Sequence, residues 1–116
     1  MSIPAVTLEQ VQAIFTVPDG IDPDAFISQG NIIFNGWANY LTGYTSQYID
    51  TMQTYFVVHL IQTFEPQSIS YAGMRISEKG IERFLGETPY GRQVLIMDTN
   101  GYFRGMGKGK PRMFSL

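Results

Sequence analysis

The alternating glycines and lysines near the C-terminus are the residues of this chain whose spacing comes closest to a phosphate-binding loop. The stretch "RGMGKGKPRMFSL" covers residues 104 to 116. A P-loop requires G-x-x-x-x-G-K-[ST] between a strand and a helix, whereas five residues separate Gly101 from Gly107 and a glycine follows Lys108. The G-x-G-x-x-G spacing of a dinucleotide site is missing too, and Pro111 opposes a helix there. We therefore expect no nucleotide site and interpret this stretch as a flexible terminus.

The single histidine, His59, stands in the most apolar stretch of the chain, "YFVVHLIQTF". A metal ligand or general base would require a carboxylate or a second ligand three or four residues away on the same helix face. Those positions hold Tyr55, Phe56, Gln62 and Thr63. We therefore expect His59 to be a core residue that bonds a hydroxyl or a backbone group.

The acidic side chains do not indicate catalysis or metal binding. The glutamates within residues 78–87 alternate with basic residues, which favours solvated ion pairs over a carboxyl whose pKa is shifted by apolar surroundings. The aspartates within residues 19–24 are explained by helix capping. The chain has no cysteine, so disulfides and thiolate chemistry are excluded. We expect no catalytic residue, no cofactor and no metal.

Charge is divided unevenly along the chain. Residues 1–74 hold six acidic residues and no Lys or Arg, whereas residues 75–116 hold eight basic and four acidic residues. Opposite-signed faces could meet between two copies or with a partner; alternatively, the two halves neutralise each other within one fold. No apolar run reaches the roughly 20 residues that span a bilayer, and the N-terminus lacks a signal-peptide pattern. We expect a soluble protein made in the cytoplasm.

Three helices are predicted in the first 64 residues. Thr7 and Gln10 have the spacing of a capping box, which begins a short helix over "TLEQVQAIF". Asp22 before Pro23 begins a second helix over "PDAFISQGNIIFNGW", although its glycines each cost about 1 kcal/mol relative to alanine. The third helix extends from a Thr45 cap to Phe64. It is apolar on two sides, so we expect it to be the central helix.

The last third of the chain predicts a β-hairpin and one more helix. Glycines at positions 73, 80 and 86 separate short segments, and we expect a hairpin near residues 73–86 that turns at "SEKG". A helical turn over "EKGIERFLG" is the alternative. Thr88 before Pro89 begins a last helix over "PYGRQVLIMD", which Asn100-Gly101 ends. The predicted fold is thus mostly α: a small bundle of about four helices with a hairpin and an extended C-terminal tail.

The order of three motifs in this chain resembles the head-to-tail connector, or head-completion adaptor, proteins of long-tailed bacteriophages. The motifs are "VVHL" at the end of the long helix, then Gly73, Ser77, Glu78 and Gly80, and then Thr88, Tyr90 and Gly91 at the start of the last helix. The resemblance covers roughly residues 8 to 100. It implies a helical connector domain over residues 1–103 with the hairpin, followed by a basic docking tail over residues 104–116.

The resemblance also implies a function. Such proteins form a ring, usually dodecameric, below the portal; it extends the channel for genomic DNA and docks the next neck or tail protein. The chain would then be a virion protein of the neck, without enzymatic activity. Hairpin residues expected at the subunit or partner interface are Ser77, Glu78, Lys79, Arg83 and Phe84. Tail residues expected there are Arg104, Lys108, Lys110, Arg112, Met113 and Phe114.

Peptide docking gives the tail a physical role, because backbone hydrogen bonds and one or two apolar anchors such as Met113 and Phe114 can supply affinity. The competing function is a small DNA-binding accessory domain that uses the basic C-terminal half. The aromatic side chains of the N-terminal half could suggest a separate stacking platform for single-stranded nucleic acid, but this half has no basic residue and would repel the phosphate backbone.

Overall fold

Helices make up the regular structure of the part of the chain that the structure describes, residues 5–64, 69, 74, 76 and 80–104 of a computed structural model. They are α1 (Leu8–Ile14), α2 (Pro23–Asn35), the 3-10 turn η1 (Ala38–Tyr40), α3 (Ser46–Thr63), α5 (Ile81–Leu85) and α6 (Pro89–Met97). A further helical turn lies at residues 102–104. No strand occurs among these residues. The predicted mostly α fold is confirmed.

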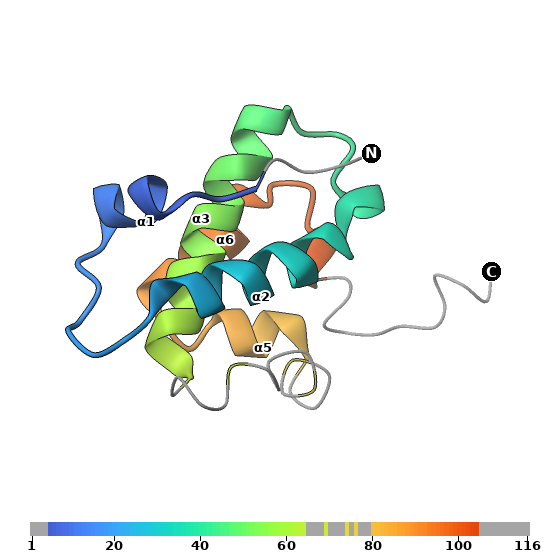
Figure 1. The fold of residues 1–116 in the computed structure, drawn as a ribbon. Coiled ribbons are helices and arrows are strands. Elements are labelled where there is room, and N and C mark those ends of the chain that lie inside the picture. The colour runs from blue at the N-terminus through green and yellow to red at the C-terminus, as the bar shows by residue number, and fades with distance from the viewer. Residues whose placement is uncertain (1–4, 65–68, 70–73, 75, 77–79, 105–116) are drawn as a thin grey trace.

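Helix α3 is the centre of the fold, as its apolar pattern predicts. Helix α2 crosses one of its sides, α6 packs on another, and α1 covers the flank beside its first half (Figure 1). The predicted cap is present, because the Thr45 side chain accepts a hydrogen bond from the Tyr48 amide. The buried residues of α3 point in all directions around the helix: Ile49, Met52, Gln53, Thr54 and all six residues from Phe56 to Ile61.

The two N-terminal helices begin where the sequence predicts. Thr7 and Gln10 form the reciprocal capping box of α1, and the Asp22 side chain accepts from the Asp24 amide at the start of α2. Gly30, which is expected to weaken α2, has a packing role. A Cβ at this position would lie 2.7 Å from Cγ2 of Val57, so the missing side chain lets α2 approach α3 closely.

The predicted β-hairpin is wrong for the described part of residues 73–86. Ile81–Leu85 forms helix α5, and Met74 and Ile76 are also helical. The reason is the spacing of the apolar residues: Ile81, Phe84 and Leu85 are all buried, and positions i, i+3 and i+4 share a face only in a helix. The expected turn at residues 77–79 lies outside the described residues.

The junction between α3 and α6 depends on His59. This side chain is fully buried, and its Nδ1 lies 2.7 Å from the Thr88 hydroxyl, which confirms the predicted core histidine. The same hydroxyl accepts from the Gly91 amide and so caps α6. A Cβ on Gly91 would lie 2.1 Å from the Leu85 carbonyl oxygen and 2.6 Å from His59 Nδ1. Only a glycine fits between these groups.

Replacing Gly91 with alanine should therefore destabilise the protein by about 3 kcal/mol, since a backbone carbonyl cannot move away as a flexible side chain can. Urea unfolding followed by circular dichroism measures the change. Gly86→Ala is the matched control: Gly86 has φ −69°, and its added Cβ would lie no closer than 3.4 Å to another atom. The control should change the unfolding free energy by less than about 0.5 kcal/mol. Equal effects of the two changes would contradict the role assigned to Gly91.

Candidate functional site: the anchor of the C-terminal tail

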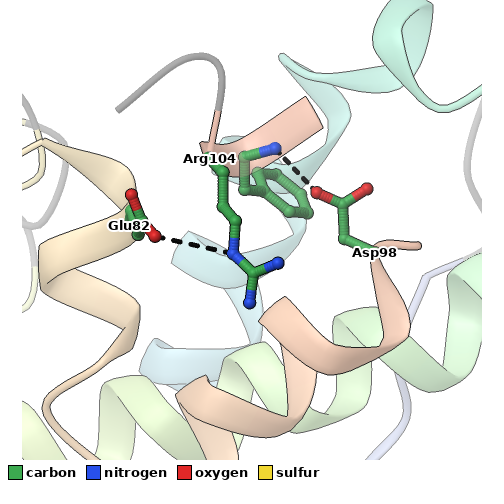
Figure 2. Close-up of polar contacts among 4 residues, drawn as sticks. Glu82, Asp98 and Arg104 are labelled. Carbon is green, nitrogen blue, oxygen red and sulfur yellow. Dashed lines mark hydrogen bonds and ion pairs between the residues drawn. The ribbon is translucent and has the colours of Figure 1, made fainter. Parts of the chain in front are cut away.

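Asp98 directly follows α6 and joins two distant parts of the chain. Its side chain is 2% exposed. One carboxylate oxygen accepts from the Phe103 amide at 2.7 Å, and the other accepts from the Tyr44 hydroxyl at 2.7 Å (Figure 2 shows the first of these bonds). Because hydrogen bonds to an ionised carboxylate are among the stronger ones in proteins, Asp98 fixes the last described turn against the loop before α3.

Two tyrosines complete this arrangement, which we call the Asp98 anchor (Tyr44, Tyr48, Asp98 and Phe103). Tyr48 donates through its hydroxyl to the Met97 carbonyl at 2.6 Å, and the Tyr44 hydroxyl accepts from the amide of residue 100 at 2.8 Å. The two rings stack with centroids 5.2 Å apart. Backbone groups that have no helical partner where α6 ends are thereby hydrogen-bonded to side chains at and just before the start of α3.

Burial raises the pKa of the Tyr44 hydroxyl above its usual value of 10.0. The Asn100 amide that donates to this oxygen acts in the opposite direction, and the Asp98 carboxylate adds to the increase. The physical reason is that a phenolate at this position would lose hydration and face a carboxylate. The neutral tyrosine is the form that fits the anchor.

Phe103 and Arg104 are the last two described residues, and their side chains differ in burial. Phe103 is fully buried, with its ring 5.1 Å from that of Trp37 and 6.0 Å from that of Phe34. The next residue points outward: Nε of Arg104 lies 3.5 Å from Oε2 of Glu82 on α5 (Figure 2). Both side chains of this ion pair are largely exposed, so it adds little stability. The base of the tail therefore has a fixed position, and Asp98 rather than Arg104 holds it.

The predicted interface residues separate into three groups. Arg83 and Arg104 are exposed. Arg83 follows Glu82 in the sequence, and Arg104 forms the ion pair with Glu82. Phe84 is in the core at 1% exposure, with its ring 4.5 Å from that of His59; this ring is not on the surface of the subunit. The others lie outside the described residues: Ser77, Glu78, Lys79, Lys108, Lys110, Arg112, Met113 and Phe114.

The described residues contain one further surface feature, a groove of about 200 Å³ between α1 and α3. Its lining residues are Gln10, Ala13, Ile14, Thr51, Thr54 and Tyr55. None of them carries a charge, so the groove suits an apolar side chain of a binding partner better than a charged ligand. Within residues 5–64 and 80–104, no three potential metal-ligating side chains come together, and no described helix is long and apolar enough to cross a membrane.

Replacing Asp98 with asparagine should destabilise the protein by about 1–3 kcal/mol, because the charged acceptor of two bonds is lost in a buried position. Hydrogen exchange of the Phe103 amide should accelerate at the same time. Arg104→Gln is the control: it removes only the exposed ion pair and should cost at most about 1 kcal/mol. Slow exchange at Phe103 in Asp98→Asn would show that the ring packing alone holds this turn.

The raised pKa of Tyr44 predicts a loss of stability at alkaline pH. The folded state retains the phenolic proton more strongly than the unfolded state, so this stabilisation is complete below the unfolded value near 10 and disappears as pH rises through the folded pKa. The urea midpoint should fall more steeply above about pH 10 in the parent chain than in Tyr44→Phe. Tyr40→Phe, at an exposed tyrosine, should retain the parent's slope. Parallel slopes for all three chains would refute the prediction.

Comparison with known proteins adds no further information about this site. No protein-family description, curated protein or solved structure matches the chain. The candidate site is therefore described by its geometry alone. It consists of a last described turn held by a buried carboxylate, an exposed ion pair beside this turn, and an uncharged groove between α1 and α3.

Proposed function

We propose that this chain is a non-enzymatic structural subunit of a virion, which forms a ring at the head-tail junction of a long-tailed bacteriophage. There it extends the portal channel and docks the next neck or tail protein. The observation that carries the proposal is the contact between two of the motifs on which the resemblance rests. They lie 29 residues apart in the chain and share one hydrogen bond.

This contact explains why the two motifs occur together. His59 belongs to "VVHL", and Thr88 and Gly91 belong to the motif that opens α6. The histidine reaches the cap of α6, and the glycine makes room for the histidine and for the turn that precedes it. Two motifs that pack against each other in this way belong to one structural unit, and this supports the resemblance. Of the third motif, Gly80 lies within the described residues, and its φ of +85° allows the chain to enter α5.

The described surface offers apolar side chains for contacts with other subunits. Four large ones are well exposed: Ile32 at 64%, Tyr40 at 44%, Met74 at 64% and Ile96 at 64%. They come from α2, η1, the segment between α3 and α5, and α6. A ring requires two different faces on each subunit, one for each neighbour. Apolar side chains on several elements suit this requirement.

The alternative function, a small DNA-binding domain, has less support from the described basic residues. Nη1 of Arg92 donates to the Gly86 carbonyl at 2.9 Å, and Arg104 pairs with Glu82. A phosphate would have to displace these two surface contacts, whereas the exposed Arg83 is the described basic residue most open to one. If DNA binding were the main function, affinity would fall steeply with salt concentration, because binding to phosphates releases counterions.

The test is the mass of the full chain in solution, measured by native mass spectrometry and light scattering over a range of concentrations. We expect a discrete species at a multiple of the 13.1 kDa subunit mass. A chain that ends after Arg104 retains the Asp98 anchor and should assemble less well, since the basic tail is missing. A monomer at every concentration, with salt-dependent DNA binding, would replace the ring with the alternative function.

A further inference from the structure

The groove between α1 and α3 has the size of a pocket for an anchoring side chain. Its volume of about 200 Å³ is below the range of about 300–1,000 Å³ that is typical of sites for small molecules. The lining is uncharged, and Tyr90 supports it from behind through the Tyr55 ring and the Ile14 backbone. Tyr90 stacks on Tyr55 with centroids 6.1 Å apart, and its hydroxyl donates to the Ile14 carbonyl. The groove is therefore a preformed surface.

The helices that form the groove have only negative charge. Glu9 lies in the first turn of α1, one turn before Ala13, and Asp50 lies on α3, one turn before Thr54. One oxygen of Asp50 accepts from Gln10, which lines the groove. The other oxygen is buried and has no hydrogen-bond partner among the described residues, so Asp50 acts on the groove through its negative charge and not through an open acceptor. Because residues 1–74 contain no Lys or Arg, neither helix can neutralise these carboxylates. An occupant with apolar and basic side chains fits best.

The last residues of the chain itself have this composition. Residues 105–116 contain Lys108, Lys110 and Arg112 and no acidic side chain, and Met113 and Phe114 follow directly. Pro111 disfavours a helix, and an extended peptide with one or two apolar anchors is a common form of docking segment.

The position of the groove indicates whose tail it receives. In Figure 1, α1 lies on one side of the molecule, and the last described turn, residues 102–104, lies across α2 and α3 on the other. Arg104 and Phe114 are ten positions apart, so a fully extended chain between them spans at most about 36 Å, and a path to their own groove would have to go around the core. In a heterologous contact, two different faces of neighbouring copies meet. The groove on one side and the tail that starts on the other can be those two faces.

We propose that the α1–α3 groove receives the C-terminal tail of a second copy of this chain, with Phe114 or Met113 inserted between Ala13 and Tyr55 and the basic residues beside Glu9 and Asp50. This inference rests on the proposed function in that it assigns the ring a subunit contact. It also specifies which two faces meet.

Disulfide cross-linking tests the proposal directly, because the chain contains no cysteine. Full-length Ala13→Cys, labelled with ¹⁵N, is mixed with unlabelled full-length Ser115→Cys, which keeps both apolar anchors, under mild oxidation, and mixed dimers are counted by mass. The matched control replaces Ala13→Cys with Gln62→Cys, an exposed position on α3 roughly 16 Å along the helix from Thr51. Docking should make the Ala13 pair form at least about tenfold faster than the control pair, since it raises the local thiol concentration. Lys110→Glu with Arg112→Glu in the Ser115→Cys chain should remove most of this advantage.

Native masses of the same mixtures separate this inference from the proposed ring. Equal cross-linking of the Ala13 and Gln62 pairs in an assembled ring would overturn the groove assignment and leave the ring in place. Fast cross-linking of the Ala13 pair in chains that never exceed a dimer would support the groove and overturn the ring. A chain with both cysteines that closes on itself as a monomer would show that the tail binds its own groove, which would overturn docking by a second copy.

Discussion

The whole fold depends on the need to cover α3 on every side. A helix with apolar residues around its full circumference is unstable in water, and burying those residues at about 25 cal/mol per Å² supplies much of the driving force for folding. Helices α1, α2 and α6 provide this cover. Close contact is possible because glycines lie at two close approaches to α3, Gly30 against Val57 and Gly91 against His59. The helices around α3 are thus positioned by backbone contact as well as by side-chain packing.

Much of the fold could be predicted because its signals are local. Caps at Thr7, Asp22, Thr45 and Thr88 are short-range hydrogen bonds that the sequence states directly, and all four helices begin there. The hairpin prediction is wrong because the spacing of the apolar residues, and not the glycines and charges around them, decides the structure of residues 81–85. Gly80 has the positive φ that the predicted turn requires, yet the residues after it form a helix, since three apolar side chains can reach the core together only in that conformation.

Less of the candidate site could be predicted. The basic tail and the exposed Arg104 are evident in the sequence, but the Asp98 anchor joins residues 54 positions apart, and no local pattern pairs a tyrosine with an aspartate at such a distance. An apolar residue soon after the Asn100-Gly101 turn was the available signal: Phe103 lies two residues beyond the glycine, where a chain that returns to the core would place it. The groove could not be predicted for the same reason: its two walls come from α1 and α3, which are far apart in the sequence.

The Asp98 anchor also determines how the subunit responds to a mechanical load. A force applied to the tail at Arg104 acts first on the Phe103 amide and its buried ring, and then on the Asp98 carboxylate. From there the Tyr44 and Tyr48 hydroxyls pass part of the load to the beginning of α3, the most deeply buried helix. Tension would therefore be shared between the end of α6 and the start of α3, and would not unwind α6 one turn at a time. A chain pulled by its tail would resist as one body up to the breaking of this carboxylate's hydrogen bonds.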